Sequence, residues 1–486
     1  MSLSQAINTA QSSLSNTSTK TSVISRNISN AANPDYNRRS AVLMTTWAGA
    51  SVATTQRSQN ETLLRESLTG TAAAASQQTL LDGLSRLQSI FGGNDYETSP
   101  ASLLAGFRDT LSTYAVKPSE NTLAETAIAD AVQLARGLQT ASAAVQDARY
   151  SADQQIARDV DQLNSLLGEF QKANDAIVRG TQAGSDINNE LDVREKLLKE
   201  ISGIVSVSTV TRSGNDLAIY TTDGLTLFER VPRPVTFVPS SGYSATLTGN
   251  AVYIDGAALP PGEGASTNGA GSLQAHLQIR DTYAPTLQNQ LDEIARGLVT
   301  VFAESDQSAT PTLPDMPGLF TWAGGTVPST GTLQKGIAAS ITVNPAVLSS
   351  KGGNPSLLRD GGINGAAYSV NPAANASFAQ QLDAYVQAFE VPLTFDSAAS
   401  LGASASLTGF AADSIGWLEQ NRSEASSAAE VREAYRFRTT ESYFNATGVS
   451  LDEEMSLLLE LEQSYKASAR LISAVDEMLQ ALLAAA

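Results

Sequence analysis

The sequence predicts a mainly α-helical protein with an inserted β domain, in which a long helical bundle or coiled coil is built from both chain termini. Three observations predict this fold class. Apolar residues recur in alternating steps of three and four near both ends, over 3–30 and 450–483. A helical pattern continues almost without interruption over 122–179, and apolar and polar residues alternate over 203–270.

The first predicted helix, residues 3–30, carries one narrow apolar seam. The seam consists of Leu3, Ile7, Ala10, Leu14, Thr17, Thr21, Ile24 and Ile28. The Asn33-Pro34 pair stops the helix, and a short connection containing Trp47 leads to the next one. This spacing is typical of a helix that packs against another helix.

The seam contains too little apolar surface to hold its helix alone. Burying its Leu and Ile side chains contributes roughly 10 kcal/mol, whereas ordering the backbone of about 25 residues costs about 25–50 kcal/mol. We therefore expect both chain ends to be mobile in the monomer and to become ordered when subunits stack. The alternative is an ordinary intramolecular helix pair that closes a bundle.

The centre of the chain contains further helices and two insertions. Helical spacing predicts helices over 61–90, 122–179, 186–202, 272–304, 375–390 and about 407–446. Consecutive four-residue steps around 152–160 resemble a stutter, which leaves room for a bend or break there. Residues 203–270 are expected to form strands, because the turn-forming stretches SGND, TDG, SSGY and TGN interrupt the alternation.

These boundaries define the expected domains. They are a terminal coiled-coil domain of 1–45 and 447–486, a helical bundle domain of 46–202, 272–306 and 373–446, an inserted β domain of 203–271, and a second irregular or β insertion of 307–372.

The last predicted helix begins with a capping box, Ser450 and Glu453, just after Gly448. Two adjacent apolar rows follow. They are Leu457, Leu461, Ser464, Ser468, Leu471, Val475, Met478 and Leu482, and then Leu451, Met455, Leu458, Tyr465, Ala469, Ile472, Leu479 and Leu483. Two rows make a face too wide for one partner helix, so we expect more than one neighbour.

Composition excludes several classes of function. The chain has no cysteine and one histidine, so thiol nucleophiles, disulfides and His-paired metal sites cannot form. The net charge of -18 argues against nucleic acid and anionic membranes as partners. No window approaches the roughly 20 apolar residues of a membrane span. Residues 1–20 lack a basic start and a continuous apolar core, so no Sec-type signal peptide is predicted.

No catalytic, cofactor-binding or metal site is predicted. The stretch GEGAST at 262–267 lacks the third glycine and following helix of a phosphate-binding loop, and His276 is expected to pack or face solvent. Asp452, Glu453 and Glu454 fit the opening turn of a helix, where the dipole favours carboxylates.

Two other sets of polar residues have simple interpretations. The cationic pair Arg38-Arg39 and the stretch REAYRFR at 432–438 are expected to be solvated helix or turn faces. Asn16 and Asn60 are hypotheses for residues that set the register of the apolar seams.

The two ends of the chain resemble the axial proteins of the bacterial flagellum. The stretch NISNAANPDYNRRS at 27–40 is similar to their "NIAN…TPGY.R" motif, except that Asp35 replaces the glycine. Asp tolerates a positive φ less easily, so the turn before Tyr36 is open to change. The C-terminal positions that match the family are Gly448, Leu451, Asp452, Glu453, Glu454, Gln463, Tyr465, Ala467, Ala469, Arg470, Ile472, Asp476, Glu477 and Met478.

Two central segments narrow the resemblance to the FlgK family of hook-associated proteins. ELDVREKLLKEISGIVSVSTV, starting at Glu190, looks like the family's "LLDQRDQLLDELSGLVGV" segment. GSLQAHLQIRDTYAPTLQNQLDEIARGLVTVF, starting at Gly271, is similar to its "G.L.glL..RD..lp..q.qLd.lA..l" helix. The two insertions carry almost no resemblance.

The resemblance implies a structural, non-enzymatic protein at the hook–filament junction, outside the cell. It implies export through the flagellar type III apparatus, self-association into a ring, and contacts with the hook protein and the adjacent junction protein. It also implies a FlgN-type chaperone that holds the C-terminal helix before export.

The residues expected to carry assembly lie on both terminal helices. On the N-terminal side they are Leu3, Ile7, Leu14, Ile24, Ile28 and Tyr36. On the C-terminal side, for assembly and chaperone binding, they are Leu451, Met455, Leu458, Leu461, Tyr465, Leu471, Ile472, Val475, Met478 and Leu482.

Two other functions stay open. One is another flagellar axial protein, either flagellin-like or the second junction protein, which the length and the LDVREKLLKEISG segment disfavour. The other is a surface adhesin or enzyme with its activity in 203–271, although that insertion has no acidic or histidine pair at catalytic spacing.

Overall fold

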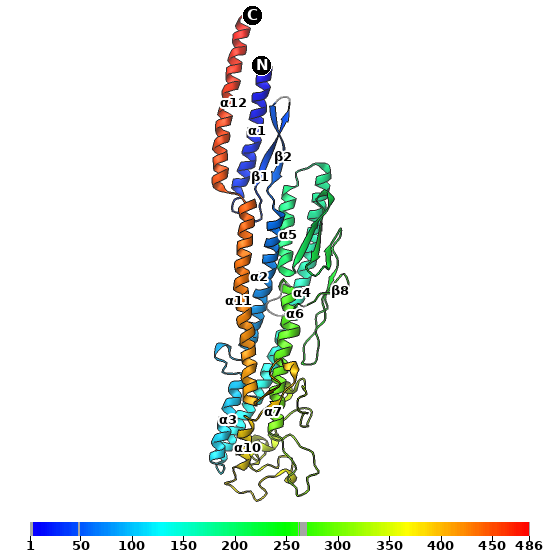
Figure 1. Ribbon diagram of the computed structural model, residues 1–486, viewed down its shortest axis with the longest axis vertical. Helices are drawn as coiled ribbons and strands as arrows, with labels where there is room; N and C mark the ends of the chain where they lie inside the picture. Colours follow the sequence, from blue (N-terminus) through cyan, green and yellow to red (C-terminus); the bar gives the residue numbers. More distant parts are fainter. Residues whose placement is uncertain (1–2, 47–48, 261, 263–269, 486) are drawn as a thin grey trace.

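The protein is an elongated rod whose two termini lie at the same end (Figure 1). The computed structural model describes residues 3–46, 49–260, 262 and 270–485, so Trp47 and most of the 262–267 stretch lie outside the described residues. Long helices run along the rod, and small β-sheets flank it on one side. The predicted fold class, mainly α with an inserted β domain, is confirmed.

The helices differ greatly in length. Those of the rod are α1 (Leu3–Ser29), α2 (Glu61–Ser89), α3 (Pro100–Val116), α4 (Asn121–Ala183), α5 (Asn188–Ile204), α6 (Ser272–Gln278), α7 (Ala284–Val301), α10 (Gln380–Ala388), α11 (Leu407–Thr447) and α12 (Leu451–Ala485). Two short ones, α8 (Ile337–Ser340) and α9 (Leu357–Asp360), lie between α7 and α10 in the chain.

The strands form five small antiparallel sheets in the described part of the chain. They are β1 (Arg39–Thr46) with β2 (Gly49–Arg57), β3 (Val207–Thr211) with β4 (Leu217–Thr221) and β5 (Thr226–Phe228), β6 (Val235–Thr236) with β7 (Tyr253–Ile254) and β8 (Ala257–Ala258), β9 (Phe320–Thr321) with β10 (Thr342–Val343), and β11 (Leu393–Thr394) with β12 (Ser404–Ala405).

The helix α4 is the backbone of the rod. Its 63 residues form one continuous helix of about 95 Å at the standard rise. It passes through 152–160 without a break, so the stutter does not interrupt it. Its Leu, Ile and Ala side chains at three-four spacing are buried, as the periodicity predicts.

The helix expected over 272–304 contains a wider turn. Between α6 and α7, residues Ile279–Tyr283 form one π-helical turn, η3. Pro285 is the second residue after this turn. Its nitrogen cannot donate to the carbonyl of Asp281, and its ring would crowd that carbonyl in an α-helix. The wider turn accommodates the proline and places Arg280 in the interior, 1% exposed.

Arg280 anchors the β insertion to α4. Its Nη1 lies 2.8 Å from Oδ1 of Asp153, and its Nη2 donates to the carbonyl of Asn250 at 2.7 Å. Asp153 is fully buried and also accepts from the hydroxyl of Tyr243 at 2.6 Å. Burial and this hydrogen bond raise the pKa of Tyr243 to about 12. The pair therefore joins α4, η3 and the loop 237–252.

The irregular stretch 307–372 belongs to the main core. Its Leu319, Phe320 and Ile337 are fully buried with residues of α4 and α7. The ring centroid of Phe320 lies 5.7 Å from that of Phe107 and 5.3 Å from that of Phe302. Short elements are therefore held here by aromatic packing. The division into domains stays a prediction.

Two elements were missing from the sequence-based prediction. The connection expected around Trp47 is instead the hairpin β1–β2, whose register breaks between Val42 and Leu43. The break and the many Thr, Ser and Ala residues hide the alternation of a strand. The helix α3 was also missed, although Ser99 caps it and Pro100 occupies its first turn.

Replacing Arg280 tests the anchor of the β insertion. R280A leaves the Asp153 carboxylate buried without its counter-charge, so we expect the free energy of unfolding to fall by about 3–5 kcal/mol. Chemical denaturation followed by far-UV circular dichroism measures it. The matched control is R108A, whose exposed pair with Glu390 contributes about 0–1 kcal/mol. Equal losses in both variants would contradict the anchoring role.

Candidate functional site

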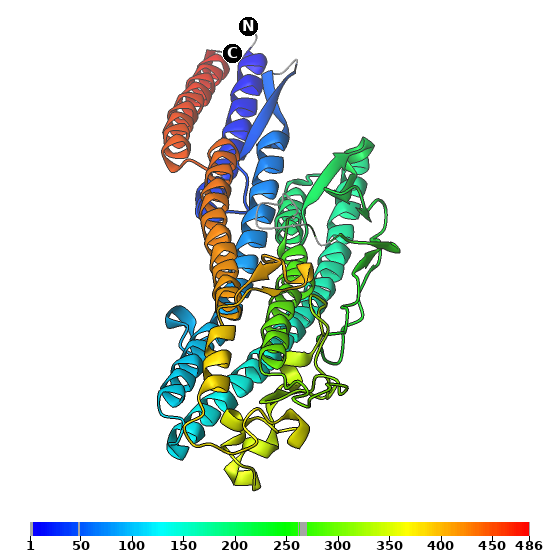
Figure 2. The same ribbon diagram turned by 60° about the horizontal axis from the view of Figure 1, so that its bottom comes forward.

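The terminal helices α1 and α12 pack side by side and project beyond the rest of the rod (Figures 1 and 2). The predicted pairing of the two chain ends is therefore observed. The hydroxyls of Ser13 on α1 and Ser468 on α12 lie 2.8 Å apart at its centre. Small and hydroxyl residues let the two helices approach closely, but they bury little apolar surface.

On α1, the predicted seam faces inward. Ala10, Thr17 and Ile24 are buried, and Ile7, Leu14, Thr21 and Ile28 are half-buried. The side chain of Leu3 lies outside the described residues. The helix also contacts the hairpin, where the side chain of Asn16 bonds to Ala50 and Val52. Asn16 thus fixes the hairpin on α1, whereas Asn60 caps α2 by accepting from the amide of Leu63.

On α12, the inward seam takes residues from both predicted rows. The positions that are buried or half-buried at heptad spacing are Glu454, Leu458, Leu461, Ser468, Ile472, Val475 and Leu479. Neither predicted row is therefore the seam by itself. The rows were drawn from apolar residues alone, and a buried carboxylate and a serine complete the true repeat.

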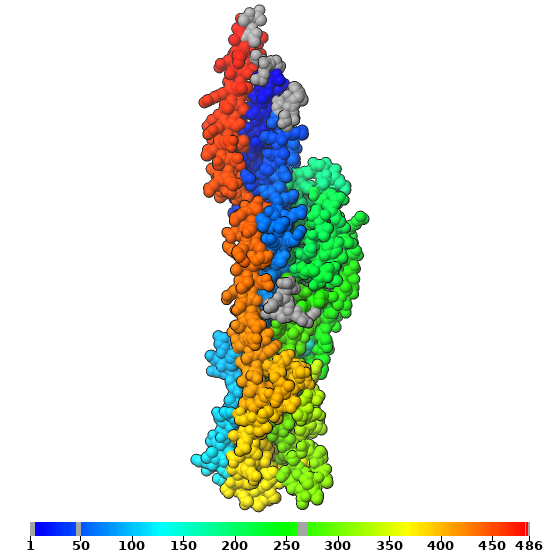
Figure 3. Space-filling view, in the orientation of Figure 1, coloured from blue at the N-terminus to red at the C-terminus, as the bar shows by residue number. Residues whose placement is uncertain are grey.

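The remaining apolar residues of α12 stay exposed. Leu451 is 51% exposed, Met455 49%, Tyr465 53%, Leu471 47% and Met478 52%. Among the predicted assembly residues Val475 is buried, and Leu458, Leu461 and Ile472 are half-buried. The side chain of Leu482 lies outside the described residues. One neighbouring helix thus leaves much of the apolar surface of α12 uncovered, and Figure 3 shows α12 (red) along one side of the projecting end.

Glu454 attaches α12 to the rest of the subunit. It is fully buried; its Oε1 lies 2.6 Å from Nε of Arg38, and its Oε2 accepts from Asn27 at 3.0 Å. Ser450 caps the same turn, since its hydroxyl accepts from the amide of Glu453 at 3.4 Å. The dipole interpretation of the acidic trio therefore misses that Glu454 points into the protein and pairs with a cation.

Asn27 is the centre of this attachment and is 1% exposed. Its amide nitrogen donates to Glu454 and to the carbonyl of Arg39, and its amide oxygen accepts from the hydroxyl of Tyr36 at 2.8 Å and the amide of Arg39 at 3.1 Å. Burial raises the pKa of Tyr36 above its usual value. Tyr36, predicted to take part in assembly, thus bonds inside the subunit, where it fixes the end of α1.

A second buried charge cluster joins the hairpin to α5. Arg39 and Arg57 face each other across the two strands, an arrangement of like charges that is unfavourable by itself. Asp192 of α5 lies between them, 2.9 Å from Nη2 of Arg39 and 2.6 Å from Nε of Arg57. Burial is the larger effect and raises the pKa of Asp192, although both arginines lower it.

Glu195 extends the cluster to α11. It pairs with Arg57, and its Oε2 accepts from Asn37 at 3.0 Å and from the hydroxyl of Tyr443 at 2.5 Å. Burial, reinforced by Glu195, raises the pKa of Tyr443. We call this group of residues the joint. It consists of Asn27, Tyr36, Asn37, Arg38, Arg39, Arg57, Asp192, Glu195, Tyr443 and Glu454.

The joint corrects one prediction and answers another question. Arg38 and Arg39 are not a solvated cationic spot, because both pair with carboxylates and Arg39 is 5% exposed. Spatial partners so distant in sequence leave no local signal. Asp35 adopts no positive φ. Its amide donates to Oδ1 of Asn33 at 3.1 Å, and its carboxylate lies 3.6 Å from Nζ of Lys199.

Much of this chain is similar in sequence to known proteins. A family model described as the flagellar hook-associated protein FlgK helical domain matches residues 84–312. A model of the C-terminal segment of the flagellar basal body rod FlgEFG proteins matches residues 440–485, which hold the end of α11 and α12.

Curated relatives agree with these matches. Flagellar hook-associated protein 1 of Escherichia coli is 23% identical over 364 residues, which cover 72% of this chain and 66% of the relative. That of Bacillus subtilis is 24% identical over 345 residues, 66% of this chain and 63% of the relative. The chain thus resembles the FlgK family of flagellar hook-associated proteins over much of its length. The resemblance of the sequence motifs to this family is therefore confirmed.

Other FlgK relatives show the extent of the likeness. The hook-associated protein 1 of Salmonella typhimurium is 24% identical over 313 residues, 62% of this chain. The chain spans 56% to 66% of the length of these three FlgK relatives. The structure of the flagellar hook junction protein FlgK from Burkholderia pseudomallei has a similar fold, with a TM-score of 0.57 at 13% identity, covering 78% of this chain and 99% of that one.

No helix in the described ranges of this chain combines the length and apolarity needed to cross a membrane.

Replacing Glu454 tests whether it fastens α12. E454A leaves Arg38 and Asn27 without their buried partner, which costs about 1.5–3 kcal/mol. We expect amide exchange in the first turns of α12 to accelerate by roughly 10- to 100-fold, while exchange in the middle of α4 is unchanged. E453A, at an exposed neighbouring carboxylate, is the control. If E454A and E453A exchange alike, Glu454 does not fasten the helix.

Proposed function

We propose that this chain is a structural subunit of the hook–filament junction of the bacterial flagellum. The similarity to the FlgK family supports this role, since its relatives are hook-associated and hook junction proteins. The role is mechanical: the subunit transmits force between neighbours and performs no chemical step. Its place is outside the cell, on the flagellum.

The uncovered apolar surface of α12 is the observation that carries the proposal. Leu451 and Met455 lie on one flank of the inward seam, and Leu457, Leu471 and Met478 lie on the other. Several large apolar side chains exposed along one helix indicate an interaction surface. In the proposed assembly both flanks are covered, by other copies in a ring and by the hook protein and the adjacent junction protein.

The N-terminal seam has a supporting part in this assembly. Ile7, Leu14, Ile24 and Ile28 hold α1 against α12 and the hairpin, so that the pair presents α12 outward. Both helices project at one end of the rod, which leaves its other end and the β insertion free of the contact (Figure 1). The proposed ordering of the pair on stacking follows from how little apolar surface it buries alone.

The same surface supports the proposed route of export. A FlgN-type chaperone would cover the apolar flanks of α12 in the cytoplasm, where an amphipathic helix fits a hydrophobic groove. The flagellar type III apparatus would then export the unfolded chain. The absence of cysteine suits this route, because no disulfide has to form after export.

Two exposed apolar residues provide the test. In L471D/M478D, charges replace side chains whose burial is worth about 1.5–3 kcal/mol each. We expect the purified subunit to fold normally, and association with neighbours to weaken at least about 100-fold. The measurement is the amount of subunit incorporated into isolated flagella of a strain that lacks its own junction protein.

The control variant is A474D/A481D, which adds the same charge at exposed positions of α12 that lie about half a turn around the helix from the inward seam and about 60° from Leu471 and Met478. It should incorporate like the unmodified chain. Removing residues 447–486 should abolish both incorporation and capture of a small acidic helical chaperone from cytoplasm. Incorporation of L471D/M478D or of the truncated chain at the control level would refute the assembly role of α12.

A further inference from the structure

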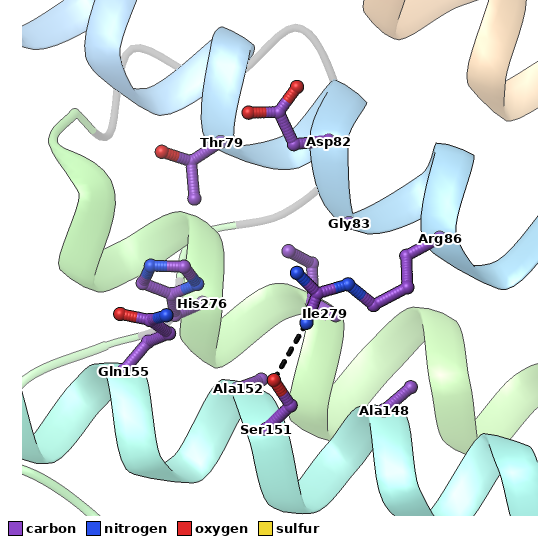
Figure 4. A pocket seen from close by; sticks show the side chains of 10 residues that line it. All are labelled: Thr79, Asp82, Gly83, Arg86, Ala148, Ser151, Ala152, Gln155, His276 and Ile279. Atoms are coloured by element: carbon purple, nitrogen blue, oxygen red, sulfur yellow. Dashed lines mark hydrogen bonds between the residues drawn. The ribbon is translucent and has the colours of Figure 1, made fainter.

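A polar pocket lies in the middle of the rod, where α2, α4 and α6 meet (Figure 4). Its volume is about 280 Å³. Small residues line it, Gly83 on α2, against which Ile279 packs, and Ala148 and Ala152 on α4. Since a water molecule occupies about 30 Å³ of liquid, the space holds several waters or one small ion.

Arg86 reaches into this pocket from α2. Its Nη1 donates to the hydroxyl of Ser151 at 2.7 Å, and the guanidinium forms no ion pair with any carboxylate of the described residues. The carboxylate of Asp82 points away from it in Figure 4 and accepts from Gln78 at 2.9 Å. Most of the guanidinium donors therefore stay available in a concave site.

His276, the single histidine of the chain, lines the same pocket from α6. Burial, reinforced by Arg158 and Arg86, lowers its pKa to about 4. At neutral pH the imidazole is uncharged and offers one N–H donor and one acceptor. Within the described part of the chain His276 makes no hydrogen bond, so its donor is unused.

The other charges around the imidazole are already engaged. On α4, Nε of Arg158 donates to Gln155 at 3.0 Å, and Asp159 accepts from the hydroxyl of Ser272 at 2.7 Å. The two arginines and the carboxylates of Asp82 and Asp159 balance in formal charge, but the charges that act on the imidazole are those of Arg158 and Arg86. Within the described residues, neither arginine forms an ion pair. The hydroxyl of Thr79 and the amide of Gln155 add neutral polar groups to the wall.

We propose that this pocket is a binding site for a small oxyanion, a carboxylate or a phosphate group, held by the guanidinium of Arg86 and the ring N–H of His276. The planar guanidinium matches both groups, since two of its N–H donors can meet two oxygens. Two sources can supply this oxyanion, a free ion or an acidic side chain of a second copy. The pocket would recognise both through the same oxygen atoms.

The single histidine is a built-in reporter for this site. In NMR spectra of the full chain its Hε1 proton gives one resonance without competing signals. Inorganic phosphate and acetate are added at constant ionic strength, and sodium chloride serves as the non-binding salt. We expect a saturable shift with a Kd of about millimolar, and a pKa of His276 raised by about one unit or more, because a nearby anion favours the imidazolium.

Linkage fixes the sign of the pH dependence. The free imidazole titrates near 4 and the phosphate-bound imidazole at a higher pH, so the affinity for phosphate, which keeps one negative charge in this range, rises as pH falls between these two values. Phosphate is the probe for this measurement, because acetate itself gains a proton in the same range. A one-unit rise in pKa corresponds to about a tenfold gain in affinity at the acid end.

Variants of Arg86 distinguish binding from a general salt effect. R86Q should lower the affinity obtained from the saturable shift at least about tenfold. R86K keeps the charge but not the planar guanidinium, so its affinity should lie between those of R86Q and the unmodified chain. R136Q removes an exposed arginine twelve residues before Ala148 on α4, about 18 Å away, and should bind normally. Thermal unfolding of each variant shows that it is folded.

Two arms identify the source of the oxyanion. A shift on adding phosphate or acetate at low protein concentration assigns a free ion. A shift that grows with protein concentration without added anion, and that R86Q abolishes, assigns a side chain of a second copy. The proposal is overturned if His276 responds equally to chloride and phosphate, if R86Q and R136Q bind alike, or if neither arm moves the resonance.

Discussion

The buried carboxylate of Glu454 fixes the position of the terminal helix pair on the rod. Glu454 lies at the base of α12, and Arg38 and Asn27 satisfy both of its oxygens inside the protein. An unpaired buried carboxylate costs several kcal/mol, so α12 can dock only where these two partners meet it. The position of Asn27 depends in turn on Tyr36 and on the backbone of Arg39. Because of this chain of bonds, the two ends of the sequence leave the rod together.

The rest of the joint links that pair to the rod. Asp192 and Glu195 of α5 hold the two hairpin arginines, and Tyr443 brings α11 into the same cluster. Three segments far apart in sequence thus share one network of charges and hydrogen bonds. Such a network favours one geometry, because a small displacement leaves several buried groups unpaired at once. The joint therefore holds the base of the projecting end in one orientation on the rod.

The sequence predicted the structure well where a local pattern of apolar or turn-forming residues repeats. Helical periodicity located α4, α11 and α12, and turn residues located the β insertion, because these signals are local. It failed where the deciding partner is distant. The carboxylate that pairs with the buried Arg39 is Asp192 on α5. The seam of α12 includes Glu454 and Ser468, which a search for apolar residues alone does not detect. The hairpin was missed because its register break and small residues weaken the alternation.

The candidate site could be located from the sequence, but its inner structure could not. Motif resemblance pointed to both ends of the chain. Which of their residues face inward depends on the joint: Tyr36 is buried inside the subunit, whereas Leu471 and Met478 lie on the surface. Their assembly roles stay a prediction.

The contact between Ser13 and Ser468 has a practical consequence. The chain contains no cysteine, so a cysteine at each of these positions would form the one covalent staple between its two ends. Oxidation would then close the pair and a reductant would reopen it in the same sample. The staple would allow the mutual pairing of the ends to be studied apart from their proposed capture by a neighbouring subunit.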